Sequence, residues 1–164
     1  MAITWEYDKA TRRGALSGTL DGDDDLGLVF ADLSGDVVVD IHGITRITSA
    51  GARSWTAAMR CIEGNATLVL ERCSVAVVCH LAINPLFRGS AVIRSVEVPH
   101  RCPSCDGAED VEMVLPVPLP IPSVRTCGFC GAQTAPDVDE TSYFEGLTSS
   151  QEASRTRDQT AGAP

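Results

Sequence analysis

The chain has 164 residues, of which 44% are hydrophobic and 21% charged, a balance typical of a folded domain. Its 13 lysines and arginines against 22 aspartates and glutamates give a net charge of −9. Because basic charge dominates binding to phosphate backbones and to anionic lipid head groups, this composition argues against nucleic-acid and membrane partners. The N-terminus lacks a basic and then apolar leader, and no apolar run is long enough for a membrane span, so we expect a cytoplasmic protein.

The first hundred residues alternate between strand and helix patterns. Period-2 alternation predicts a strand at residues 3–7, which a polar turn joins to a second strand at 14–20. An acidic cluster, whose carboxylates can cap a helix, precedes a short helix at 26–33. The later elements are expected as an apolar strand at 36–41 covered on both faces, a helix at 49–61, a strand at 66–70, a helix at 74–81 and a strand at 91–98. This order predicts an α/β fold, a mixed sheet with helices packed on it.

Composition divides the chain into three predicted regions. Residues 1–99 form the α/β domain, and residues 100–136 hold four cysteines and a proline-rich stretch. Residues 137–164 are polar and have few large apolar side chains. Since such a segment cannot bury enough surface to offset the entropy lost on ordering, we expect 137–164 to be a disordered tail.

One stretch, VVDIHGITRITSAGAR at residues 38–53, runs from an apolar strand ending in Asp, through a short loop, to a helix that opens with Ser-Ala-Gly. Together with the element order over residues 3–98, this motif resembles the STAS family, named for sulfate transporters and anti-sigma-factor antagonists. The resemblance implies a STAS-like mixed β-sheet and a role in bacterial signalling, as an antagonist that binds an anti-sigma factor or a kinase-like protein. The family's usual Asp before the motif serine is Thr48 here.

The resemblance also implies a site. In phosphorylatable family members the motif serine is the acceptor for an anti-sigma-factor kinase, and that role falls on Ser49. The implied partner-binding surface consists of Thr48, Ser49, Ala50, Gly51 and Arg53. A phosphate on Ser49 would add about −1.5 to −2 charges that a partner would have to desolvate, so phosphorylation would switch binding off. From the residues alone, Thr48 or Ser49 can equally well be a plain helix cap, and both interpretations stay open.

Seven cysteines are many for a cytoplasmic chain, and four of them form two C-x₂-C pairs. Cys102 and Cys105 make the first pair and Cys127 and Cys130 the second, with 21 residues between the pairs. Two such pairs can supply four thiolates to one tetrahedral ion, so the sequence predicts a zinc ribbon with one structural Zn²⁺ per chain. Four protein ligands leave no position for a water nucleophile, which argues against a catalytic zinc. Redox-labile disulfides, or a site that has lost its metal, are the alternatives.

Prolines at every second position of residues 115–122 force an extended or polyproline conformation, so this segment is not a central strand. It is either the tip of the ribbon, offering its apolar side chains to a partner, or it lies back on the sheet. His100, just before the first cysteine pair, is expected at the surface.

The sequence contains no signature of a serine–histidine–acid or cysteine–histidine site and no glycine-rich phosphate loop, so we do not expect an enzyme. The leading hypothesis is a non-catalytic protein–protein interaction module in bacterial regulation. The alternative is a regulatory or scaffold subunit of a larger complex, for example a transporter-associated one. A zinc-ribbon factor that binds nucleic acid is disfavoured by the net charge of −9.

Overall fold

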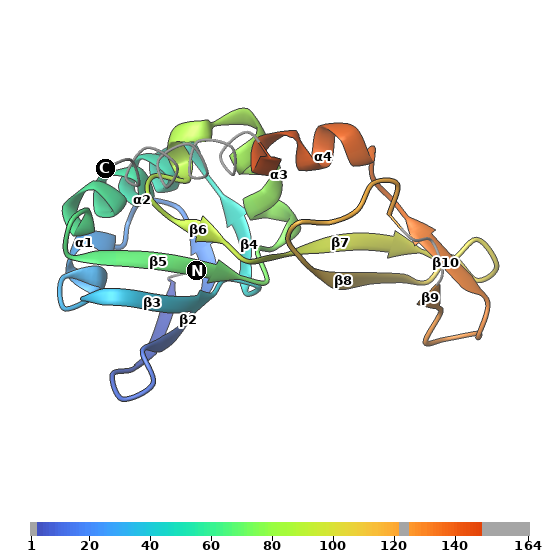
Figure 1. Ribbon diagram of the computed structural model, residues 1–164, viewed down its shortest axis with the longest axis horizontal. Helices are drawn as coiled ribbons and strands as arrows, with labels where there is room; N and C mark the ends of the chain where they lie inside the picture. The colour runs from blue at the N-terminus through green and yellow to red at the C-terminus, as the bar shows by residue number, and fades with distance from the viewer. Residues whose placement is uncertain (1–2, 122–124, 149–164) are drawn as a thin grey trace, which may run out of the picture.

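The computed structural model describes residues 3–121 and 125–148, which form the mixed α/β architecture predicted from the sequence (Figure 1). The larger sheet of this part of the chain contains β1 (Thr4–Asp8), β2 (Arg13–Leu20), β3 (Gly35–Asp40), β4 (Ile44–Ile47), β5 (Ala66–Glu71) and β6 (Val92–Ile93). The smaller sheet contains β7 (Ser95–Arg101), β8 (Ala108–Val114), β9 (Arg125–Thr126) and β10 (Gln133–Pro136). The helices are α1 (Leu26–Phe30), α2 (Ser49–Ile62), α3 (Val75–Ile83) and α4 (Glu140–Thr148), with a 3₁₀ turn η1 (Pro85–Phe87). None of the described helices is long and apolar enough to cross a membrane.

The larger sheet branches at β2. Its order is β1-β2-β3-β5-β6, and β4 lies beside the end of β2. The first half of β2 pairs in parallel with β3 and the second half with β4, with a register shift between Gly18 and Thr19. The sequence predicts a loop where β4 forms. Four residues are too few to show the period-2 pattern of a strand. β4 can therefore be recognised only from its pairing with β2 in the folded chain.

The main core lies between this sheet and the helices α2 and α3, which cover one of its faces (Figure 1). Trp55, Met59 and Ile62 are all buried, as their spacing of i, i+4 and i+7 requires for one stripe on α2. The indole N–H of Trp55 donates to the carbonyl oxygen of Phe87 at 2.8 Å, and the two rings stack with centroids 5.2 Å apart. This contact fixes η1, and therefore the end of α3, against α2.

The prediction that the strand at 36–41 is covered on both faces is wrong. Val37 and Val39 are fully buried, but Val38 on the other face is only half-buried and Asp36 is exposed. Val37 and Val39 belong to the same core as the buried residues of α1, α2 and α3, which lie on one side of this sheet (Figure 1). A run of three valines therefore hides the ordinary alternation of a strand that is covered on one face.

The predicted single strand at 91–98 is divided in the structure, because β6 belongs to the larger sheet and β7 to the smaller one. Two hydrogen bonds tie β7 to the segment that follows β5: the Cys73 N–H donates to the Ser95 carbonyl oxygen at 3.0 Å, and the Glu97 N–H donates to the Cys73 carbonyl oxygen at 2.9 Å. Because β7 runs from Ser95 to Arg101, the predicted domain boundary after residue 99 falls inside a strand.

The prediction of a disordered tail over 137–164 is wrong for Glu140–Thr148, which forms α4 beside α3 (Figure 1). Residues 149–164 lie outside the described residues. The buried side chains of α4 are Tyr143, Phe144 and Leu147. The Tyr143 hydroxyl donates a hydrogen bond to the backbone oxygen of Glu97 on β7. These three large side chains are enough to hold α4 against the core, although the rest of the segment is polar.

The proline-rich segment lies mostly against the core, which favours the second of its two predicted placements. Ile121 is buried, and Leu115 and Val117 are partly buried against the core, whereas Leu119 is 51% exposed. The Ile121 N–H donates to the Glu140 carboxylate at 2.9 Å, which ties the segment to the start of α4.

Candidate functional site

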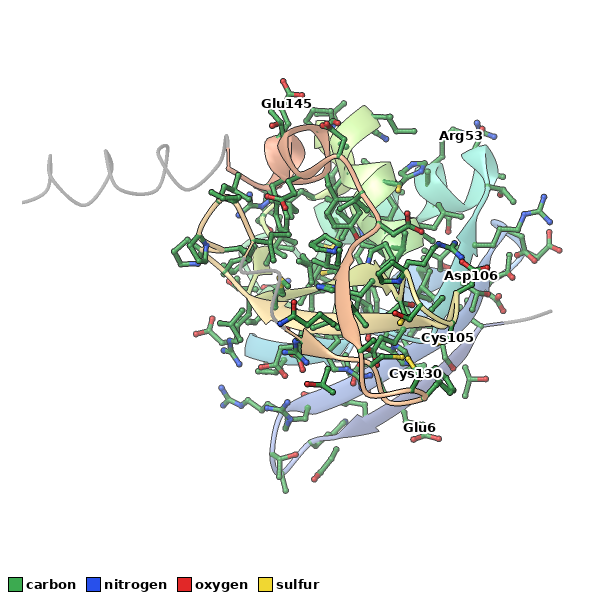
Figure 2. The ribbon with its side chains drawn as sticks, turned by 90° about the vertical axis from the view of Figure 1, so that its right-hand side faces the viewer. Glu6, Arg53, Cys105, Asp106, Cys130 and Glu145 are labelled. Atoms are coloured by element: carbon green, nitrogen blue, oxygen red, sulfur yellow. The ribbon has the colours of Figure 1, made fainter. Side chains whose placement is uncertain are left out.

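Four cysteines converge where the turns of two hairpins meet. Cys102 and Cys105 lie on the β7–β8 turn, and Cys127 and Cys130 on the β9–β10 turn; Figure 2 shows Cys105 and Cys130 close together at this end of the molecule. The sulfur of Cys102 is 3.5 Å from that of Cys130, that of Cys105 is 3.7 Å from that of Cys127, and all four lie within 4.8 Å of one another. Zinc–sulfur bonds of about 2.3 Å in a tetrahedron separate the sulfurs by about 3.8 Å. The four thiols can therefore hold one metal ion.

The two cysteine turns share one backbone geometry. The N–H groups of Cys102 and Cys127 each donate to the carbonyl oxygen five residues later, at 2.9 and 2.7 Å. The N–H groups of Asp106 and Gly131 donate back to the carbonyl oxygens of these cysteines, at 2.9 and 3.0 Å. Asp106 and Gly131 are also both left-handed, with φ of 57° and 76°. Two segments 25 residues apart in the sequence thus form the same tight turn, and each turn offers its pair of sulfurs to a common centre.

The thiols of the cluster influence one another's ionisation. Although desolvation opposes the thiolate, the backbone N–H groups of Cys105 and Ser104 and the thiol of Cys130 lower the pKa of Cys102 to about 7. For Cys105, the N–H of Gly107 favours the thiolate, but the neighbouring thiols raise its pKa to about 12. Metal coordination requires deprotonated sulfurs, and a bound cation favours that state.

His100 lies inside the protein, although the sequence predicts it at the surface. It is 1% exposed, and its Nδ1 is 2.9 Å from the carbonyl oxygen of Val98. Its Nε2 has no hydrogen-bond partner in the described ranges, and its ring is not part of the four-cysteine cluster. The alternation of β7 places His100 on the same face as Val98 and Cys102, and that face is turned inward.

The second predicted site is the N-terminus of α2. Thr48 is the helix cap: its Oγ1 accepts a hydrogen bond from the Gly51 N–H at 3.1 Å and donates one to the backbone oxygen of Asp21 at 3.2 Å. Ser49 follows as the first helical residue, is exposed, and its hydroxyl has no hydrogen-bond partner among the described residues. Capping therefore occupies Thr48 and leaves the Ser49 hydroxyl free.

The predicted partner-binding residues differ in how much surface they offer. Ser49 and Arg53 are exposed, Thr48 and Ala50 are half-buried, and Gly51 is buried against the end of β2. The side chains that a partner can reach are thus chiefly those of Ser49 and Arg53, whereas Gly51 serves the packing of the helix.

The division of roles between Thr48 and Ser49 leads to a testable difference. We expect Thr48→Ala to lower the free energy of unfolding by about 1 kcal/mol, since it removes a helix cap. We expect Ser49→Ala to change it by less than about 0.5 kcal/mol, as is usual for an exposed side chain without partners. Urea unfolding of the two variants compares these values directly. Equal losses would contradict the assignment of Thr48 as the cap.

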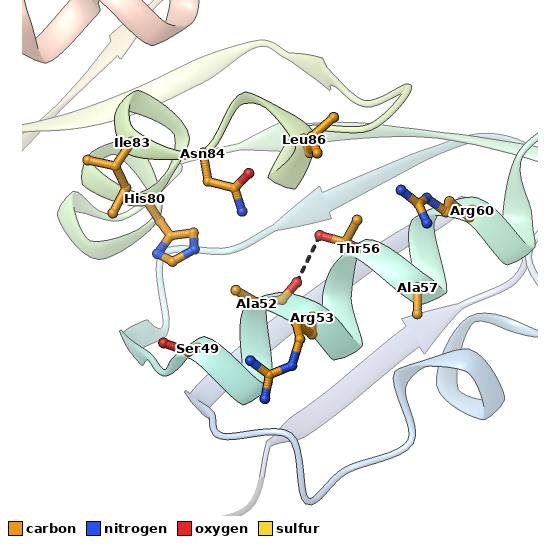
Figure 3. Close-up of a pocket in the computed structure, with 10 residues that line it drawn as sticks. All are labelled: Ser49, Ala52, Arg53, Thr56, Ala57, Arg60, His80, Ile83, Asn84 and Leu86. Carbon is orange, nitrogen blue, oxygen red and sulfur yellow. Dashed lines mark hydrogen bonds between the residues drawn. The ribbon is translucent and has the colours of Figure 1, made fainter.

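Ser49 and Arg53 open onto a groove of 520 Å³ between α2 and the corner formed by α3 and η1 (Figure 3). The α2 wall carries Ser49, Arg53, Thr56 and Arg60, and the opposite wall carries His80, Ile83 and Leu86. Burial lowers the pKa of His80, whose ring lies edge-on to that of Phe87 with centroids 4.8 Å apart. A neutral imidazole at pH 7 leaves the two arginines as the positive groups of the groove. The opposite wall could not be predicted from the sequence, because its residues join α2 only in the folded chain.

Comparison of the chain with protein-family models, with curated proteins and with solved structures found no match. A functional assignment therefore depends on the cysteine cluster and on the surface around Ser49.

Proposed function

We propose that this protein is a non-catalytic, cytoplasmic protein–protein interaction module of bacterial regulation, resembling an anti-sigma-factor antagonist. Its partner, an anti-sigma factor or kinase-like protein, binds the N-terminus of α2 and the adjoining groove. The observation that carries the proposal is the exposed hydroxyl of Ser49, which no described residue binds, at the start of a well-capped helix and on the rim of an open groove. The strand β3, which ends in Asp40, and the helix α2, which begins at Ser49, also match the two ends of the stretch on which the STAS resemblance rests, although β4 lies where that stretch predicts a loop.

Ser49 is the proposed phosphoacceptor of this module. Its position at the first turn of α2 allows a phosphate to form without unfolding the helix, because the positive end of the helix dipole tolerates negative charge. The same charge would face a docked partner, which would have to desolvate it. Phosphorylation therefore switches binding off.

We further propose that the four-cysteine cluster is a zinc-ribbon-like module holding one structural Zn²⁺. Four thiolates at tetrahedral spacing are a donor set that zinc prefers. All four positions are filled by the protein, so the ion orients the β7–β8 and β9–β10 turns and takes no part in a reaction.

The proposed interface is tested by site-specific photo-crosslinking in the source bacterium. A photoreactive amino acid in place of Arg53 is expected to crosslink a specific protein. The same probe in place of Ala15, exposed on the uncovered face of the larger sheet, is not. Ser49→Asp should abolish the crosslink from position 53 and Ser49→Ala should keep it. The same products from positions 53 and 15 would contradict the proposed interface, and an unaffected crosslink in Ser49→Asp would contradict the switch.

A further inference from the structure

We propose that the groove between α2 and the α3–η1 corner binds an amphipathic helix. This helix carries acidic residues along one face and large apolar residues along the adjacent face. This inference rests on the proposed function and deepens it, because it names the chemistry of the segment that the partner inserts.

The α2 wall of the groove favours an acidic ligand. Arg53 and Arg60 are seven residues apart, which places them two turns, or about 10.5 Å, apart along one side of the helix. Neither has an ion pair among the residues that the structure describes. Within the described ranges, carboxylates pair with Arg13, Arg72, Arg94 and Arg101. On a chain of net charge −9, two unpaired cations in one groove attract acidic groups spaced at i and i+7.

The opposite wall favours apolar side chains. Ile83 is 78% exposed and Leu86 is 66% exposed, and both line the groove opposite α2, from the end of α3 and from η1 (Figure 3). They are two of the seven large hydrophobic residues that are exposed in the described part of the chain. A ligand that covers both removes this apolar surface from water, which is the usual driving force for a helix that lies in a groove.

The groove suits a helix better than an extended peptide. It follows α2 from Ser49 to Arg60, about 16 Å or three helical turns. An extended peptide needs partners for its backbone N–H and C=O groups, whereas a helix satisfies its own. The α2 wall offers few acceptors for peptide N–H groups, because the guanidinium groups of Arg53 and Arg60 only donate. The hydroxyl of Thr56 already donates to the carbonyl oxygen of Ala52 at 2.8 Å, the dashed line in Figure 3.

Ser49 lies one turn before Arg53 on the same side of α2. Residues at i and i+4 of a helix are neighbours, so a phosphate on Ser49 can pair with the Arg53 guanidinium. It would thereby take one of the two cations away from an acidic ligand and also repel that ligand. The geometry gives the proposed switch a physical route, in which phosphate and partner carboxylates compete for Arg53.

The test uses the zinc-loaded full chain and a labelled synthetic peptide of about 16 residues, roughly four helical turns, with leucines on one side and glutamates on the next. The comparison peptides carry lysines in place of the glutamates, or the same residues in scrambled order. Fluorescence anisotropy should show binding of the acidic peptide at least about tenfold tighter than of either comparison peptide. Arg53→Glu, Arg60→Glu and Leu86→Ser should each weaken it by about three- to tenfold. Ser49→Asp should weaken it in the same direction. Arg125→Glu, an equal charge change on β9, should leave the affinity unchanged.

Equal affinity for the glutamate and lysine peptides, or an equal loss from Arg125→Glu and Arg60→Glu, would overturn this inference. If the crosslink from position 53 then still depends on Ser49, the partner inserts a segment of other chemistry and the proposed function stands. If that crosslink is absent as well, both proposals fail.

Discussion

Removing zinc from the purified protein is expected to unfold the β9–β10 hairpin and to leave the larger sheet folded. β10 pairs with β7 through two residue pairs and with β9 through two more, and such short ladders are marginal without another source of stability. In small zinc-binding peptides the ion contributes about 10–16 kcal/mol of apparent binding free energy at pH 7. Hydrogen exchange followed by mass spectrometry, before and after chelation, should show protection lost over residues 125–136. Elemental analysis should give one zinc per chain with four of the seven thiols protected.

Two variants separate metal loss from general damage. Cys102→Ser removes one predicted ligand and should release zinc and expose the hairpin, whereas Cys61→Ser removes an exposed cysteine outside the cluster and should do neither. Because zinc displaces the thiol protons, its affinity for the native chain should fall as the pH is lowered. Normal protection of residues 125–136 in Cys102→Ser would contradict a metal-dependent hairpin. Two disulfides and no zinc in the native chain would support the redox alternative.

Local signals predicted the parts of the fold that local chemistry determines. The start of α2 follows from a capping threonine, and its buried face follows from the spacing of Trp55, Met59 and Ile62. The close approach of the four cysteines follows from their pairwise spacing, which requires only two turns and one common centre.

Long-range pairing determines the parts that were missed. Buried Glu97 on β7 is held by Nδ1 of His42 at 2.6 Å and by the Arg72 guanidinium at 3.3 Å, and these residues lie 55 and 25 positions earlier in the sequence. No periodicity marks such contacts. The same holds for the groove, because Ile83 and Arg53 come to line it through the packing of Trp55 on η1. The α/β fold class and the convergence of the four cysteines were therefore predictable from the sequence, and the shape of the proposed interface was not.

Gly51→Ala is expected to destabilise the protein by about 3 kcal/mol, at the upper end of the usual cost of overpacking. A Cβ at this position would lie 2.0 Å from the carbonyl oxygen of Leu20 and 2.9 Å from the backbone nitrogen of Asp21. Backbone atoms cannot rotate away as a side chain can, so α2 would have to move off the end of β2. That movement would also stretch the 2.8 Å hydrogen bond from the Thr48 N–H to the same Leu20 oxygen. Urea unfolding of the variant measures the loss.

Gly64→Ala is the matched control for this substitution. Gly64 has a φ of 88°, but a Cβ there meets nothing within 4 Å, so alanine should cost only backbone strain of about 1 kcal/mol. A loss in Gly51→Ala no greater than in Gly64→Ala would mean that α2 does not pack on β2 as closely as described. If the larger loss is found, folded Gly51→Ala should also crosslink its partner poorly from position 53. The close contact between Gly51 and the backbone of Leu20 also determines where Ser49 and Arg53 lie on the rim of the groove.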